Sequence, residues 1–263
     1  MSATTPVLDV SGTSPIPFSR LVRVELRKTF DTRAGRWLAI AIAAMVVLVD
    51  AIVLIVTVVN DQPVSFDDFT GAAAFLTSIL LPVLGIMLVS SEWSQRTAMV
   101  TFALEPRRPR VILAKATVGV VLALVTVVIA LAVGMICNLL YGAMHGNADW
   151  SMSWGSVLAF AATQIFSMLG GFALATLLLN TPASIVVFFA YKWVLPIVFA
   201  IGGNVMTWFQ SFGQWLDFQA AQRELFDPPL TGAQWAHLVV SGVVWLLVPL
   251  VLGIWRVLRA EVK

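Results

Sequence analysis

Six long apolar runs constrain this chain more than any other feature of its sequence. They cover residues 37–59, 70–90, 116–141, 154–179, 183–203 and 235–255. Each is long enough to cross a hydrocarbon layer about 30 Å thick, which takes roughly 20 residues of α-helix. The runs are continuous rather than alternating, so they indicate helices and not the strands of a membrane barrel. The sequence therefore predicts an all-α polytopic membrane protein with six spans.

The composition excludes several other classes. Of the 263 residues, 59% are apolar and 11% are charged, and the mean hydropathy is +0.92. Soluble domains are roughly 45–50% apolar and about 25% charged. The core of a soluble protein of 263 residues could not bury so much apolar surface, which excludes an ordinary soluble enzyme; so apolar a composition also excludes a disordered chain. The net charge is +2, and the Lys and Arg residues do not gather on one face of a soluble domain, so we expect no nucleic-acid partner.

The charged residues orient the six spans. Fourteen of the 16 Lys and Arg residues precede the first span, lie between the second and third, or follow the sixth. The opposite side carries seven acidic residues and a single base, Arg223. Basic loops remain in the cytoplasm, so we expect both termini to be cytoplasmic and the protein to lie in the cell membrane. The remaining base, Lys192, falls inside the fifth span.

The chain before the first span divides into two parts. Residues 1–17 are rich in Ser, Thr and Pro and are predicted to be a disordered tail. Residues 18–36 contain a helix over 18–32 whose apolar side chains share one face, while the rest carries the bases Arg20, Arg23, Arg27 and Lys28. Such a helix would lie flat on the anionic inner leaflet. The alternative is a solvated basic flank that only fixes topology. Residues 37–256 form the membrane domain, and 257–263 form a second tail.

The loop over residues 91–115 is the most informative connection. Its first half predicts a short helix over 92–104, with Trp93, Val100 and Leu104 on one side and polar contacts offered by Glu92, Gln95 and Arg96. Two prolines then end this helix. Three arginines follow at the level of the lipid phosphates, namely Arg107, Arg108 and Arg110. A plain basic loop would explain the arginines but not the amphipathic segment before them.

Residues 204–234 are rich in aromatic side chains, which would be a liability in water. We expect them to form short helices that dip into the outer interface, where Trp is favoured. They could serve as an outer gate or only as a membrane anchor.

Two ionisable residues fall inside spans. Asp50 and Lys192 would each cost roughly 2.5–3.5 kcal/mol to insert. One hypothesis is that they approach each other or line a polar cleft. The alternative places Asp50 near the outer interface and lets Lys192 extend to the membrane surface. Asn138 and Gln164 are further polar positions, suited to a transport path or to helix packing.

Signatures of catalysis and metal binding are absent from the sequence. It contains no GxxxxGK[ST] phosphate loop, no GxSxG elbow and no HExxH or CxxC spacing. We therefore expect no enzymatic activity, cofactor or metal on this chain.

The order of these features resembles a known family. The segments LVRVELRKTFDTR, LLPVLGIMLVSSEWSQRTAMVTFALEPRRPRVILAK and ALATLLLNTPASIVVFF look like those of actinobacterial ABC-2 type transporter permeases, the transmembrane subunits of type V ABC exporters. The resemblance extends from about residue 18 over nearly the whole chain. It implies that 18–32 is the connecting, or elbow, helix and that 204–234 holds re-entrant outer helices. The 92–104 segment would be the coupling helix, with Glu92, Trp93, Gln95, Arg96, Val100 and Leu104 at or near an ATPase contact.

The same resemblance implies partners. An ATPase subunit would bind ATP and Mg, and a second permease, identical or related, would complete the path in the lipid bilayer through the first and fifth spans. Lys192 is an unusual charge for such a span. A secondary transporter and a non-transporting scaffold remain alternatives. A membrane-embedded enzyme would need a cluster of catalytic side chains that the chain lacks.

Overall fold

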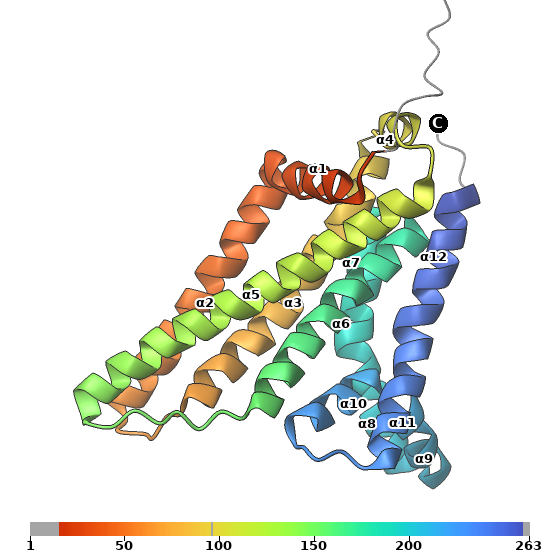
Figure 1. Ribbon diagram of the computed structural model, residues 1–263. Helices are drawn as coiled ribbons and strands as arrows, with labels where there is room; N and C mark the ends of the chain where they lie inside the picture. The colour runs from red at the N-terminus through yellow and green to blue at the C-terminus, as the bar shows by residue number, and fades with distance from the viewer. Residues whose placement is uncertain (1–15, 96, 260–263) are drawn as a thin grey trace, which may run out of the picture.

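The structure is a computed structural model that describes residues 16–95 and 97–259 (Figure 1). Within these ranges the chain is helical and contains no β-strand beyond an isolated bridge between Ser65 and Asp149. The helices before the fifth span are α1 (Phe18–Asp31), α2 (Arg33–Val59), α3 (Phe66–Ser94), α4 (Ala98–Leu104), α5 (Arg108–His145) and α6 (Trp154–Leu178). Those that follow are α7 (Thr181–Phe189), η1 (Ala190–Val194), α8 (Leu195–Val205), α9 (Thr207–Leu216), α10 (Phe218–Arg223), η2 (Glu224–Phe226), α11 (Gly232–Gly242), η3 (Val243–Leu247) and α12 (Val248–Arg259).

Six of these segments are long and apolar enough to cross a membrane. They are α2, α3, α5, α6, the α7–η1–α8 unit and the α11–η3–α12 unit. The prediction of an all-α polytopic membrane protein with six spans is confirmed. Most of these helices run beyond the predicted limits, and α5 has 38 residues, or about 57 Å. The tail predicted from residue 257 is instead helical as far as Arg259, while 1–15 and 260–263 lie outside the described residues.

Helix α3 lies at the centre of the bundle and contacts α2, α5, α6 and α7. In its most apolar stretch 56% of the residues are buried, against 6% in the α7–η1–α8 unit, which lies at the periphery. Glycines let α3 and α6 cross closely. A Cβ on Gly171 would collide with the backbone oxygen of Pro82, and one on Gly85 would come within 2.5 Å of the Met168 carbonyl oxygen. Small residues let membrane helices approach closely, and van der Waals contact between the backbones then stabilises the pair where the hydrophobic effect contributes little.

The fifth and sixth spans each contain a π-helical segment. Helix α7 passes into η1, and Pro196 then lies in the first turn of α8, where its missing N–H is tolerated. Helix α11 passes into η3 in the same way. The rings of Tyr191 in η1 and Trp245 in η3 are 5.0 Å apart. The two irregular segments therefore face each other inside the bundle.

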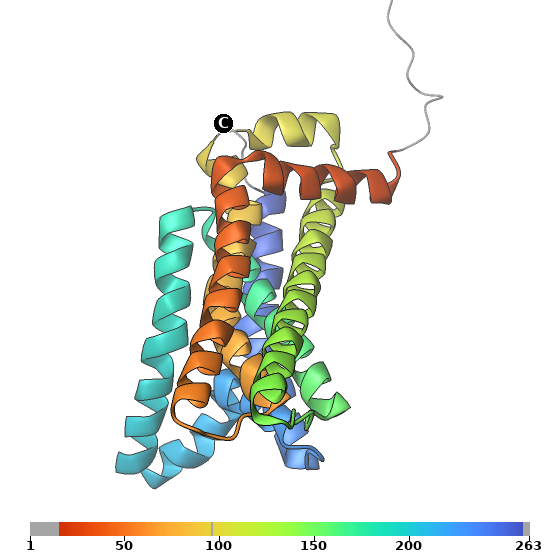
Figure 2. The same cartoon turned by 90° about the vertical axis from the view of Figure 1, so that its left-hand side faces the viewer.

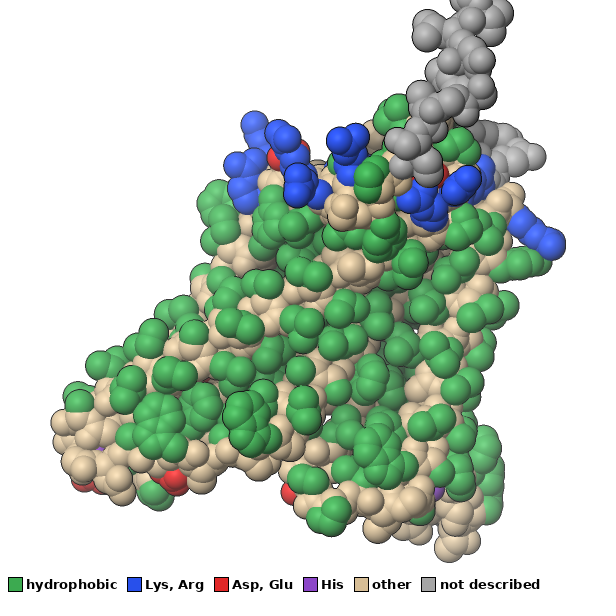
Figure 3. Space-filling model, viewed as in Figure 1, with side chains coloured by type: hydrophobic (Ala, Val, Ile, Leu, Met, Phe, Trp, Pro, Cys, Tyr) green, Lys and Arg blue, Asp and Glu red, His purple; other side chains and the backbone are tan. Residues whose placement is uncertain are grey.

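The two ends of the bundle differ in charge. We call the end that carries α1, α4 and the last turn of α12 the basic end, because Lys and Arg side chains gather there (Figure 3). Helices α1 and α4 lie across this end, roughly perpendicular to the spans (Figure 2). The far end carries the loop between α5 and α6 and the short helices α9, α10 and η2. The short helices predicted over 204–234 are present as α9, α10 and η2, while their insertion into the outer interface stays a prediction.

The single helix predicted over 92–104 is wrong. Helix α3 continues to Ser94, and α4 begins only at Ala98. The turn between them is closed by the Thr97 N–H, which donates to the Glu92 carbonyl oxygen at 2.9 Å. Glu92 therefore belongs to the last turn of a spanning helix and not to α4.

Candidate functional site: a charged junction at the basic end

A tight corner holds α1 across the basic end. Thr32 lies between α1 and α2, and its hydroxyl accepts a hydrogen bond from the Gly35 N–H at 3.1 Å and donates to the Thr29 carbonyl oxygen at 3.2 Å. A Cβ on Gly35 would collide with that carbonyl. The cap satisfies an N–H that the first turn of α2 would otherwise leave unpaired. The corner therefore turns one face of α1 toward the end of α3 and the start of α5.

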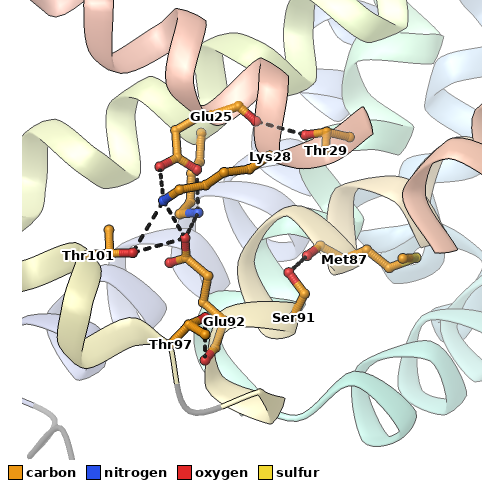
Figure 4. A network of polar contacts seen from close by, with 9 residues as sticks. Glu25, Lys28, Thr29, Met87, Ser91, Glu92, Thr97 and Thr101 are labelled. Carbon is orange, nitrogen blue, oxygen red and sulfur yellow. Dashed lines mark hydrogen bonds and ion pairs between the residues drawn. The ribbon is translucent and has the colours of Figure 1, made fainter. Parts of the chain in front are cut away.

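That face carries Glu25 and Lys28, which belong to a cluster of charged side chains (Figure 4). The Lys28 ammonium lies 2.9 Å from both Glu25 Oε1 and Glu92 Oε1, while Lys115 lies 2.5 Å from Glu25 Oε2 and 3.0 Å from Glu92 Oε1. Thr101 Oγ1 is 3.2 Å from both Lys28 Nζ and Glu92 Oε1. We call these five residues the charged junction. It joins α1, α3, α4 and α5, which are separated by up to 90 residues in the chain.

Burial makes the junction sensitive to the loss of a member. Glu25, Glu92 and Lys115 are buried, with exposures of 4%, 8% and 5%, and only Lys28 reaches solvent appreciably. Two carboxylates and two ammoniums leave no net charge. Burial disfavours the charged form of Lys28, but hydrogen bonds and ion pairs to Glu92 and Glu25 outweigh it and raise the pKa of Lys28. An ion cluster of this kind stabilises a unique arrangement only while every member has its partners.

The junction fixes the face that α4 turns outward. Ala98 is buried and Phe102 packs against Trp93, with ring centroids 6.4 Å apart. The opposite face carries exposed apolar side chains, namely Met99 (51%), Val100 (61%) and Leu104 (74%). Contiguous exposed apolar side chains on a polar end mark an interaction surface. Helix α4 thus presents an apolar outer face on a rigidly held frame.

The residues predicted for an ATPase contact separate into three groups. Val100, Leu104 and Gln95 are exposed. Glu92 and Trp93 face inward and hold the α3–α4 turn, so they are placed to support the surface and not to touch a partner. Arg96 lies outside the described residues.

The predicted interfacial bases also divide. Arg20, Arg23, Arg27 and Arg107 are exposed, as expected for residues at the phosphate level. Lys28 instead belongs to the junction. Arg108 donates to the Val257 carbonyl at 2.9 Å, and Arg110 pairs with Glu105 at 3.2 Å and donates to the Ile16 carbonyl. These two arginines fasten the start of α5 to its neighbours.

The structure does not bring Asp50 and Lys192 together. Lys192 Nζ lies 3.3 Å from Ser78 Oγ on α3. Asp50 is fully buried on α2, and within residues 16–95 and 97–259 its carboxyl oxygens have no hydrogen-bond partner. Asn138 donates to the Asp149 carbonyl at 2.9 Å and Gln164 to the Ala74 carbonyl at 3.2 Å, so both amides tie elements of the bundle together.

Glu25 was not predicted as a site residue, and Lys115 was counted only among the bases that orient the spans. A signal was present for Glu25, which lies four residues after Leu21 and three after Val22 and thus falls within the apolar stripe of its helix. An acid on an apolar face needs a buried base. Which base supplies it depends on how α1 crosses α5, and helical periodicity does not determine that crossing.

Comparisons with known proteins leave the family open. No protein-family model matches the chain, and no curated protein matches it either.

Proposed function

We propose that this chain is the membrane-spanning permease subunit of an ATP-binding cassette exporter. The basic end faces the cytoplasm, so that both termini lie there, α1 is the elbow helix and α4 is the coupling helix. ATP and Mg bind to a separate ATPase polypeptide, and the chain itself has no catalytic role. The observation that carries this proposal is the apolar outer face of α4, presented on the basic end by a buried ion cluster.

The position of α4 favours a protein partner. Helix α4 has seven residues and is too short to span a membrane, yet it exposes Met99, Val100 and Leu104. The surrounding arginines would anchor the basic end at the phosphate level, and α4 lies across the outermost part of that end, beyond the spans (Figure 2). A small apolar knob on a charged rim is the pattern of a docking contact.

The charged junction suits a helix that transmits force. Thr101 on α4 bonds to Glu92 at the end of α3 and to Lys28 on α1, and Lys115 ties the same cluster to α5. A displacement of α4 would therefore be transmitted directly to α1, α3 and α5 through these side-chain contacts and not through a flexible linker. Rigid elements with two discrete arrangements are what couple distant sites.

A second permease subunit would complete the path. Six spans supply one half, and the least buried spans are α2, with 17% of its most apolar stretch buried, and the α7–η1–α8 unit, with 6%. These faces contact lipid or a second subunit, either an identical chain or a related permease. A secondary transporter and a non-transporting scaffold are the other candidates, and neither requires the outer face of α4.

The experiment is affinity purification of the tagged full-length chain from its native host in a mild detergent, with quantification of the co-purifying ATPase. Val100→Asp and Leu104→Asp should each reduce the ATPase by roughly tenfold, because a charge at the centre of an apolar contact is costly. The matched control is Val59→Asp, which alters an exposed apolar side chain at the end of α2, at the opposite end of the bundle from α4. Equal recovery of the ATPase with all three variants would contradict the assignment of α4.

A further inference from the structure

A cavity of about 290 Å³ lies in the far half of the bundle, away from the charged junction. Its walls come from α3, α6, η1, α10 and η3, and both π-helical segments contribute side chains. Helix α10 packs against α6, where the rings of Phe218 and Phe166 are 5.5 Å apart (Figure 1). Such interruptions in helices are frequent at functional sites. The volume suits a headgroup or a small ligand and not a whole lipid.

The charge of this cavity is positive. Lys192 and Arg223 line it, and no acidic side chain is among the described residues that do. The two nearest acids along α10 and η2 have other partners. Asp217 caps α10 through the Gln219 and Ala220 N–H groups, and Glu224 accepts from Gln234 at 2.6 Å. An ammonium within a membrane span is costly, and among residues 16–95 and 97–259 the hydrogen-bond partner of the Lys192 ammonium is the neutral hydroxyl of Ser78.

A side chain from another helix satisfies backbone groups of the irregular segment around Lys192. Gln219 on α10 donates to the carbonyl oxygens of Tyr191 and Lys192 at 3.1 and 3.0 Å, so these two carbonyls of η1 have side-chain partners. Gln164 also lines the cavity, with 1% of its surface exposed. Its amide oxygen has no hydrogen-bond partner within the described residues, and it requires a donor. The site therefore offers cations for an anion and an acceptor for a hydroxyl.

Part of the remaining wall is apolar and reaches the surface between α3 and the fifth span, while Ser78, Thr163 and Ser167 add hydroxyl groups. Phe75 on α3 lines the cavity, yet 60% of it is exposed, and its ring lies edge-to-face with that of the exposed Trp193, 6.2 Å away. The opening therefore lies between α3 and the fifth span, on a face that the membrane would cover.

We propose that this cavity binds the headgroup of an anionic phospholipid that carries free hydroxyls, such as phosphatidylglycerol. The phosphate lies beside Lys192 and Arg223, a headgroup hydroxyl donates to the Gln164 amide oxygen, and the acyl chains leave past Phe75. This inference does not rest on the proposed function, because binding needs no ATPase.

The test uses the purified full-length chain in a mild detergent and measures lipid retention by native mass spectrometry. Phosphatidylglycerol is titrated against phosphatidylcholine, and free glycerol phosphate is a separate competitor. We expect phosphatidylglycerol to bind at least tenfold more tightly than phosphatidylcholine. Lys192→Gln should reduce its affinity roughly tenfold or more, because a hydrogen bond to a charged group is lost.

Arg223→Gln provides a second variant on an exposed side chain and should weaken binding in the same direction even if Lys192→Gln fails to fold. Arg20→Gln is the matched control, since this exposed base lies at the basic end, and it should leave binding unchanged. Equal binding of the two lipids, or unchanged affinity in both cavity variants, would overturn the proposal. Competition by free glycerol phosphate at the same concentration as the lipid would overturn the lipid assignment in favour of a soluble anion.

Discussion

Replacing Lys115 with methionine should destabilise the protein by about 3–5 kcal/mol, the cost of breaking a buried ion pair by removing one partner. The Lys115 ammonium lies 2.5 Å from Glu25 and 3.0 Å from Glu92, and only 6% of its side chain is exposed. Its loss leaves two buried carboxylates that share Lys28 alone. Lys28→Met should cost about 1 kcal/mol or less, because 41% of the Lys28 side chain is exposed and solvent screens its charge.

The assay is the free energy of unfolding of the purified protein in mixed micelles. Glu92→Gln introduced together with Lys115→Met should restore much of the loss, since Glu25 and Lys28 then balance and the new amide can still bond to Thr101. The control is Arg23→Met, an exposed base on α1 whose removal should change stability by no more than about 0.5 kcal/mol. A Lys115→Met cost equal to that of Arg23→Met, or no recovery in the double variant, would refute the reasoning.

Three further predictions test other parts of the account. Gly171→Ala should destabilise the α3–α6 crossing by about 1–3 kcal/mol, whereas Gly71→Ala, with no atom within 4 Å of its added Cβ, should be neutral or stabilising when thermal unfolding is measured. The pKa of Lys28 is raised above its ordinary 10.5 in the folded protein. Lys28 therefore contributes its full share to the free energy of unfolding below pH 10.5, and this contribution is lost as the pH rises through the folded pKa. The stability deficit of Lys28→Met should therefore be constant over roughly pH 6–9 and shrink only above about 10.5, and a deficit that varies within the lower range would count against the ion pairs. A membrane-impermeant maleimide should label Asn147→Cys but not Arg23→Cys in intact cells, because Asn147 is exposed at the far end, which we place outside the cell. The native Cys137 is buried and should give no background labelling. The opposite labelling would reverse the proposed orientation.

Much of the fold could be predicted from the sequence, because the membrane acts on single helices. Span length follows from the thickness of the bilayer, so each of the six runs can be read alone. The basic flanks and the helix that became α1 follow from charge placement and from one helical period. None of these features depends on which helix packs against which.

The site was harder to predict, because it depends on contacts between helices. Glu92 was assigned to a surface helix, but α3 continues past it and places its carboxylate inside the charged junction. The choice of Lys115 as partner of Glu25 depends on the crossing of α1 and α5. Counting residues places both Asp50 and Lys192 inside spans, yet Lys192 bonds to Ser78 on α3. Position along a helix determines depth, and packing determines partners.

Site-specific photocrosslinking can show whether the outer face of α4 contacts an ATPase. A benzophenone amino acid is placed at Leu104, which is 74% exposed on α4, and, as the control, at Trp154, which is 84% exposed at the far end. After irradiation of native-host membranes, mass spectrometry identifies the crosslinked peptides. We expect position 104 to capture a polypeptide with a GxxxxGK[ST] phosphate loop and position 154 not to capture it. Capture of lipid alone at position 104, or of the same ATPase at both positions, would contradict it.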